Sequence, residues 1–363
     1  MVVDDSAVIR GLIIRSLELD PEITVVASAS NGEMALNALA RHDIEVVVLD
    51  IEMPIMDGLT ALPKLLAAKP GLKIIIASTL TRRGADISMR ALAAGAADYL
   101  TKPAISVIIS ADEFKRDLLA KVKVLGEASR GIVALKSLRS TPPALRRTEE
   151  LAPDHPLRRV IALRPMSRET PEVVAIGAST GGPQALFRVL GALKGAVSQP
   201  IFITQHMPAT FTTILAEHIA RASGFSATEA ADGEPVSAGH VYIAPGDFHM
   251  TVEQTAPGHK VVRVAKGPPE NFCRPSVDPM LRSLAANYGS RLLSLVLTGM
   301  GKDGLAGSKA VVEAGGTVIA QDEATSVVWG MPGAVARAGL CSAVLPLGEI
   351  GPFVCRLAAR GPR

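Results

Sequence analysis

The chain has 363 residues, of which 48% are hydrophobic and 20% charged, and this length predicts two domains with separate cores. The net charge is only +3 and aromatic residues make up 3% of the chain, so a nucleic-acid partner is not expected. No apolar run approaches the roughly 18 residues of a membrane span, and the first residues lack a secretory signal, so we expect no membrane insertion.

Residues 1–125 alternate short apolar runs with amphipathic segments, a pattern typical of an α/β domain with a doubly wound parallel sheet. The expected strands and helices are, in chain order, Met1–Val3, Ala7–Leu19, Thr24–Ser28, Asn31–Arg41, Val46–Leu49, Leu59–Ala68, Lys73–Ala77, Ala85–Ala94, Ala97–Leu100 and Ala111–Leu125.

Polar residues follow four of these apolar runs: Asp4, Asp5, Asp50, Ser78 and Lys102. In a parallel sheet these positions meet at the carboxyl edge, where open α/β sheets bind ligands. Three carboxylates gathered there would repel one another without a hard cation, and their oxygens suit Mg²⁺. Taken singly, each carboxylate is better explained as a helix N-cap or a solvated loop residue. As a set they favour a phosphoryl-transfer site with Asp50 as nucleophile.

The stretches VVDDSAVIR, VVVLDIEMPIMDG, IIIAST and DYLTKP resemble the response-regulator receiver domain, which has a flavodoxin-like fold. The resemblance covers residues 1–125 and implies an aspartyl phosphate made by a histidine kinase. It also implies these residue roles: phosphorylation at Asp50; Mg²⁺ held by Asp4, Asp5 and Asp50; and switch residues Lys102, Tyr99 and Ser78 or its neighbour Thr79.

The first expected strand is unusually short, because only Met1–Val3 precede the acidic pair, whereas a strand usually has about 5 residues. Either the start has been assigned downstream of the true one or the receiver is destabilised, and we favour the first interpretation.

Residues 126–170 are expected to be a linker between a domain at 1–125 and a second domain at 171–363. Prolines recur from Pro142 to Pro171, the apolar periodicity fades after Leu138, and the small positive charge excess lies in this segment. Such a linker is long enough to let one domain cover the other.

Residues 171–363 again alternate between strands and helices and predict a second, Rossmann-like three-layer αβα domain with a mostly parallel sheet. The expected elements are Val173–Ile176, Pro183–Leu193, Pro200–Thr204, Thr210–Ala222, Val241–Ala244, Lys260–Val264, Pro279–Ala286, Leu292–Leu297, Gly304–Ala314 and Thr317–Ala320.

Ser179 lies in the spacing Gly177-x-Ser179-x-Gly181, where an apolar strand turns into a helix. This stretch alone fits either a nucleophile turn or a degenerate phosphate-binding turn. His206 and Asp303 follow the ends of two other strands, so nucleophile, base and orienting carboxylate can converge on one edge. The next strand ends without the acidic residue that a dinucleotide ribose needs, which disfavours the phosphate reading. His249 is the reserve base, and Asp278 is the rival of Asp303, although it equally fits a helix N-cap.

The stretches GASTGGPQAL, ITQHMPATF, YIAPGDFHM, RPSVDPML and LTGMGKDG resemble the CheB-type chemotaxis methylesterase domain, over essentially all of 171–350. The resemblance implies Ser179 as nucleophile, His206 as base, Asp303 as its orienter, and an oxyanion hole near Thr180 and Met300. It implies an esterase without a cofactor that demethylates glutamate methyl esters on chemoreceptors and also deamidates receptor glutamines. Phosphorylation of the receiver is expected to uncover the Ser179 edge.

Two other function classes agree less well with the sequence. A signalling adaptor with a vestigial triad would have been favoured by a missing triad residue, and none is missing. A DNA-binding regulator needs a basic recognition helix after the linker, and residues 171–363 contain none.

The three widely spaced cysteines, Cys273, Cys341 and Cys355, form neither a disulfide framework nor a zinc motif, which fits a cytoplasmic protein. We expect it to be monomeric.

Overall fold

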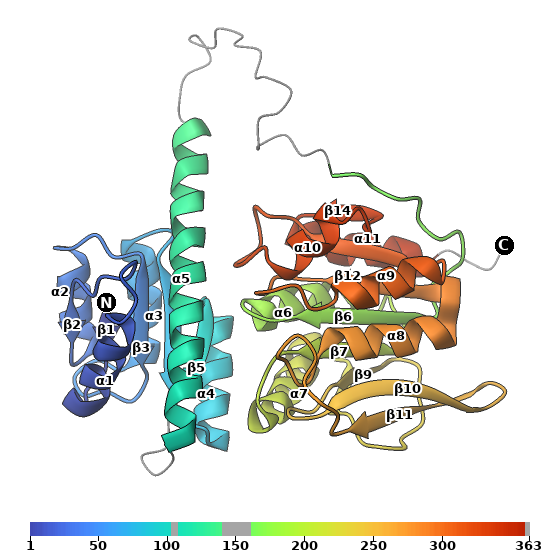
Figure 1. The fold of residues 1–363 in the computed structure, drawn as a ribbon, viewed down its shortest axis with the longest axis horizontal. Coiled ribbons are helices and arrows are strands. Elements are labelled where there is room, and N and C mark those ends of the chain that lie inside the picture. The colour runs from blue at the N-terminus through green and yellow to red at the C-terminus, as the bar shows by residue number, and fades with distance from the viewer. Residues whose placement is uncertain (103–107, 140–160, 360–363) are drawn as a thin grey trace, which may run out of the picture.

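The structure, a computed structural model, describes residues 1–102, 108–139 and 161–359. Two parallel sheets, each covered by helices on both faces, form the receiver-like half and the second half of the chain (Figure 1). This confirms the α/β fold class predicted for both halves. No helix in the described ranges is long and apolar enough to cross a bilayer.

The first half is a five-stranded sheet with the order β2-β1-β3-β4-β5, in which all neighbouring strands are parallel. Its elements are β1 Val2–Val3, α1 Ala7–Leu17, β2 Ser28–Ala29, α2 Gly32–Leu39, β3 Val46–Asp50, α3 Gly58–Ala68, β4 Lys73–Ser78, α4 Arg82–Ala93, β5 Asp98–Thr101 and α5 Ile108–Arg139. Although β1 has two residues, it pairs with both β2 and β3 and so keeps Asp4 at the carboxyl edge. Helices α1 and α5 pack together on one face, and α2 packs on α3 on the other.

Helix α5 differs from the expectation, because it continues past Leu125 to Arg139 and takes up the first part of the expected linker. Part of this extension is anchored on the receiver, where Arg130 pairs with Glu45 at 2.9 Å and the Ser129 hydroxyl donates to the Gly71 carbonyl. Residues 140–160, which hold most of the proline-rich stretch, lie outside the described residues.

The second half is a seven-stranded parallel sheet with the order β14-β13-β12-β6-β7-β9-β8. Its elements are β6 Val173–Ala178, α6 Gly182–Leu193, β7 Ile201–Gln205, α7 Ala209–Ser223, β8 Ser226–Glu229, β9 His240–Ile243, α8 Val277–Tyr288, a 3₁₀ turn at Gly289–Arg291, β12 Leu292–Val296, α9 Leu305–Glu313, β13 Thr317–Gln321, α10 Met331–Arg337, β14 Ala343–Leu345 and α11 Leu347–Ala358. The expected strand at Lys260–Val264 belongs instead to a separate antiparallel hairpin of β10 His249–Ala256 and β11 His259–Ala265.

Strands β6, β7 and β12 are buried along their whole lengths, which explains their continuous apolar sequences. Helices α6, α7 and α11 cover one face of this sheet, and α8, α9 and α10 cover the other. Because β12 pairs with β6 and β6 with β7, the loops after these three strands lie side by side at the carboxyl edge.

Candidate active site and receiver site

Ser179 lies on the turn between β6 and α6 and is half-buried at the carboxyl edge of the sheet. Its amide donates to the Thr298 carbonyl at 3.0 Å, and its own carbonyl accepts from the Gly182 amide at 2.7 Å. Gly181, the N-cap of α6, has a φ of 75°, a left-handed conformation that favours glycine. The glycines flanking Ser179 therefore allow the sharp strand-to-helix turn expected from the sequence.

Close packing holds this turn in place. A Cβ on Gly299 would lie 2.8 Å from the Cβ of Ser179, and one on Gly182 would lie 1.9 Å from the Gln205 amide oxygen. The Gln205 side-chain nitrogen donates to the Ser179 carbonyl at 2.9 Å. The nucleophile candidate is thus held by the end of β7 and by the loop that follows β12.

His206 and Asp303 are paired at the same edge, with His206 Nε2 at 2.8 Å from Asp303 Oδ2. Burial lowers the pKa of His206, but its hydrogen bonds to Asp303 and Cys273 outweigh burial and raise it to about 9. Burial raises the pKa of Asp303, but the His206 hydrogen bond and backbone donors lower it to about 2. The pair therefore favours an imidazolium beside a carboxylate.

Asp303 lies at the N-terminus of α8, where backbone dipoles favour a negative charge. Besides the His206 contact it accepts hydrogen bonds from the Val277 amide at 2.6 Å, the Ser276 hydroxyl at 2.8 Å, the Gly304 amide at 2.9 Å, the Asn271 side chain at 2.9 Å and the Asp278 amide at 3.2 Å. A carboxylate with this many donors stays ionised and holds one orientation.

Asp278 and His249, the alternatives predicted from the sequence, have other roles. Asp278 accepts from the Gly307 amide at 2.6 Å and from Asn271, and does not contact His206. His249 is bonded at both ring nitrogens, to the Pro268 carbonyl at 2.9 Å and the Ser276 amide at 3.2 Å. Both residues support the loop before α8, so the structure places Asp303, and neither of these, on the imidazole.

The Ser179 hydroxyl is not hydrogen-bonded to His206 within the described residues. Since Asp303 occupies Nε2, the nitrogen left for Ser179 is Nδ1, and the Cys273 sulfur lies 3.5 Å from it. Sequence reasoning missed Cys273 and Asn271, having tested cysteines only for metal and disulfide patterns. Their position just before RPSVDPML was the available signal.

Thr180 and Met300, named for the oxyanion hole, lie on the loops after β6 and β12. Within the described residues neither backbone amide has a hydrogen-bond acceptor, whereas the neighbouring Ser179 and Gly299 amides both do. The Thr298 hydroxyl donates to the Thr180 carbonyl at 2.9 Å and so holds the following Thr180–Gly181 peptide. Both amides are therefore without an acceptor among the described residues.

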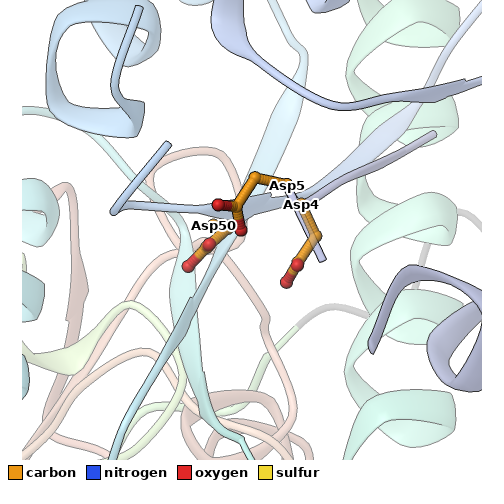
Figure 2. A group of neighbouring side chains, drawn as sticks. All are labelled: Asp4, Asp5 and Asp50. Atoms are coloured by element: carbon orange, nitrogen blue, oxygen red, sulfur yellow. The ribbon is translucent and has the colours of Figure 1, made fainter. Parts of the chain in front are cut away.

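The receiver site brings the three predicted carboxylates together. Figure 2 shows Asp4, Asp5 and Asp50 grouped where β1 and β3 end, and their oxygens lie within 4.8 Å of one another. Lys102 Nζ lies 2.8 Å from Asp4 and 2.7 Å from Asp50, and burial raises the pKa of Asp50. Asp4 is buried, with Lys102 as its charged partner. An all-oxygen set of three carboxylates fits Mg²⁺.

Of the predicted switch residues, Lys102 contacts this cluster, whereas Ser78 and Tyr99 lie apart from it. The Ser78 hydroxyl donates to the Gly84 carbonyl of α4 at 3.0 Å, so Ser78 faces α4 rather than Asp50. Tyr99 is buried and stacks on Phe211 of α7, with ring centroids 4.5 Å apart. Tyr99 therefore lies in the contact between the receiver and the second domain.

This contact reaches the Ser179 turn itself. Thr180 Oγ1 donates to Asp98 of β5 at 2.8 Å, and Gln184 of α6 donates to the Ala96 carbonyl. Helix α4 packs on α6 and α7 (Figure 1). Val328, from the loop that touches the Ser179 turn, joins the apolar cluster of Phe114 and Leu118 on α5.

A polar rim surrounds this apolar contact. His218 Nε2 of α7 lies 2.8 Å from Asp86 of α4, Arg221 lies 3.6 Å from the same carboxylate, and Arg82 pairs with Glu217. The receiver thus covers one side of the candidate active site.

Comparison with known proteins identifies both halves. Residues 174–354 match the family described as CheB methylesterase, and residues 1–111 match the response regulator receiver domain. The chain is 62% identical to the protein-glutamate methylesterase/protein-glutamine glutaminase of Azospirillum brasilense, over 99% of this chain and 92% of that protein. Identity to the protein of the same name numbered 1 in Paramagnetospirillum magneticum is 60%, over 99% and 96%.

The crystal structure of the Thermotoga maritima CheB methylesterase catalytic domain is also similar, with a TM-score of 0.50 and 41% identity over 52% of this chain and 100% of that one. The chain therefore belongs to the protein-glutamate methylesterase/protein-glutamine glutaminase family, with a response regulator receiver domain ahead of a CheB methylesterase domain.

Proposed function

We propose that this enzyme hydrolyses glutamate methyl esters on methyl-accepting chemoreceptors and deamidates receptor glutamines, under the control of phosphorylation. The observation that carries the proposal is the His206–Asp303 pair at the sheet edge that also bears the Ser179 turn. The names of its relatives supply the substrate class. Because the substrate side chains belong to cytoplasmic receptor helices, the enzyme acts in the cytoplasm; the expectation of a monomer stays a prediction.

In the proposed mechanism Ser179 attacks the ester carbonyl, and His206 takes its proton at Nδ1, the nitrogen that Asp303 leaves free. Asp303 stabilises the resulting imidazolium, consistent with the raised pKa of His206, about 9. The same proton passes to the departing methoxide, so that methanol leaves and an acyl-enzyme remains. Water, deprotonated by His206, then releases the carboxylate; with a glutamine substrate the leaving group is ammonia.

The tetrahedral intermediate places a negative charge beside the turn, and the unbonded amides of Thr180 and Met300 are the proposed donors to it. Cys273 lies on His206 Nδ1 in this structure, so productive binding requires the imidazole to exchange its thiol contact for the Ser179 hydroxyl. The thiol contact, still in place here, accounts for the absence of a hydrogen bond between the described residues Ser179 and His206.

The direct test is methanol release from a methylated receptor fragment. Ser179→Ala should abolish release, whereas Ser198→Ala, which changes an exposed serine remote from the Ser179 turn in sequence, should leave it unchanged. Full release by the Ser179 variant would show that the nucleophile assignment is wrong. Failure of a fluorophosphonate to label Ser179 would instead favour an adaptor with a vestigial triad.

The receiver is proposed to accept a phosphoryl group at Asp50 from a histidine kinase. Asp4, Asp5 and Asp50 would hold Mg²⁺, which when bound neutralises charge on the phosphoryl oxygens. Lys102 adds a second positive charge; burial lowers its pKa, but contacts with Asp4 and Asp50 outweigh burial and raise it.

Phosphorylation is proposed to release the receiver from the Ser179 edge. The Asp98–Thr180 hydrogen bond and the Tyr99–Phe211 stack support this, because both join the receiver to the esterase domain. We expect a phosphodonor, or removal of residues 1–140, to accelerate methanol release. A truncated enzyme no faster than the unphosphorylated full chain would contradict the proposal.

A further inference from the structure

A two-residue turn in the loop between β11 and α8 has an unusual residue at its tip. Glu270 and Cys273 exchange both backbone hydrogen bonds, at 3.1 and 2.9 Å, and enclose Asn271 and Phe272. The two central residues have φ values of 52° and 63°, as in a type I′ turn. Such a turn favours Asn followed by Gly, so an aromatic residue at its second position is a genuine outlier.

This turn is held against the proposed active site on three sides. Glu270 pairs with Arg282 of α8 at 2.7 Å, and the Asn271 side chain donates to Asp303 at 2.9 Å. Cys273 lies 3.5 Å from His206 Nδ1. Phe272 is therefore carried by a backbone that is fixed to both members of the imidazole–carboxylate pair.

The Phe272 ring nevertheless projects into solvent, with a relative exposure of 103% in the full chain, receiver included. Burial of this ring does not stabilise the fold, and its left-handed backbone costs free energy relative to glycine. Phenylalanine at position 272 therefore gains no stability from burial and costs backbone free energy relative to glycine. A rigidly held, exposed aromatic side chain is, by contrast, a typical contact residue for a protein partner.

We propose that Phe272 is a substrate-binding residue that packs against the apolar surface of the receptor helix bearing the methyl ester. The inference rests on the proposed function, since it takes the chemoreceptor as the partner. The receiver does not cover Phe272, so this contact is open in the covered and the uncovered enzyme alike. Phe272 would increase affinity for a protein substrate and take no part in bond making or breaking.

The test replaces Phe272 by glycine in the full, phosphorylated chain and compares two substrates. For a methylated receptor fragment we expect kcat/KM to fall about tenfold, mainly through KM, as for loss of one aromatic contact at an interface. For a small γ-methyl ester of glutamate, which carries no receptor helix for Phe272 to contact, kcat/KM should be unchanged. The melting temperature should be equal or higher, because glycine relieves the turn.

Ile55 offers a matched control, because it is also exposed and has a φ of 69°, but it lies in the receiver. Ile55→Gly should relieve similar strain without changing either substrate's kinetics, and Phe272→Tyr should keep the receptor activity. Unchanged receptor kinetics in Phe272→Gly, or equal losses on both substrates, would overturn the inference. If the wild-type chain hydrolyses only the small ester, the proposed function fails first, and the inference with it.

Discussion

The polar rim between the domains allows a quantitative test of the covering contact. Asp86 of α4 contacts His218 at 2.8 Å and Arg221 at 3.6 Å, both on α7, and touches neither the phosphorylation site nor the triad. The His218 hydrogen bond lowers the pKa of Asp86, so the carboxylate stays ionised at neutral pH. Asp86→Ala removes both contacts and leaves a residue that favours the helix.

The expected size of the effect follows from the exposure of this pair. With about two-fifths of the Asp86 side chain exposed, its two contacts together are worth about 1 kcal/mol. That value would shift the ratio of uncovered to covered enzyme about fivefold. If the uncovered form is the minor one, the rate of the unphosphorylated enzyme should rise by this factor. The rate of the phosphorylated enzyme should not change, because that enzyme is already uncovered.

Methanol release from a methylated receptor fragment measures this, with and without a phosphodonor. Asp43→Ala is the control, because it breaks an ion pair with Lys69 that lies wholly within the receiver. Adding His218→Ala to the Asp86 variant should give little further increase, since both changes remove one shared contact. An unphosphorylated rate equal to wild type, or equal increases in both states, would refute the reasoning.

The remaining predictions concern the two sites separately. Because the pKa of His206 is raised to about 9, kcat/KM in a pH–rate profile should rise with pH until about pH 9. Cys273→Ala removes one cause of the raised pKa and should therefore move this rise in kcat/KM to lower pH. Gly299→Ala should cut methanol release more than tenfold in the same assay, since its Cβ would lie 2.8 Å from that of Ser179. A chelator should abolish activation by a phosphodonor but leave the basal esterase rate unchanged, as measured on the unphosphorylated enzyme.

Sequence and structure agree on how the candidate site residues are grouped where polar residues follow strand ends. Ser179, His206 and Asp303 lie far apart in the chain, yet each follows a buried parallel strand, and such strands end at one edge. The same reasoning grouped Asp4, Asp5 and Asp50. It favoured Asp303 over its rival Asp278, which equally fits a helix N-cap, and in the structure Asp303 is the carboxylate hydrogen-bonded to the imidazole.

What the sequence did not reveal lies in loops and between domains. The turn at Asn271 and Phe272 contains no glycine, so its left-handed conformation had no local signal. Helix α5 continues past its expected end at Leu125 to Arg139, and Ser129 and Arg130 in the first part of this extension bond to the receiver. Contacts between domains join surfaces from distant segments, and no periodicity in either segment encodes them.

Thr180 joins the candidate esterase site directly to strand β5 of the receiver. Its backbone amide is a proposed oxyanion donor, and its hydroxyl donates to Asp98 on the receiver. Asp98 is buried, and burial raises its pKa despite its contacts with Lys121 and Thr180. The next residue on β5, Tyr99, is the proposed switch residue and stacks on Phe211. A rearrangement of β5 on phosphorylation would therefore break the Thr180 contact and the aromatic stack in one step. Covering of the site and positioning of the oxyanion donor are then two consequences of a single equilibrium, which phosphorylation can shift only by its differential stabilisation of the uncovered state.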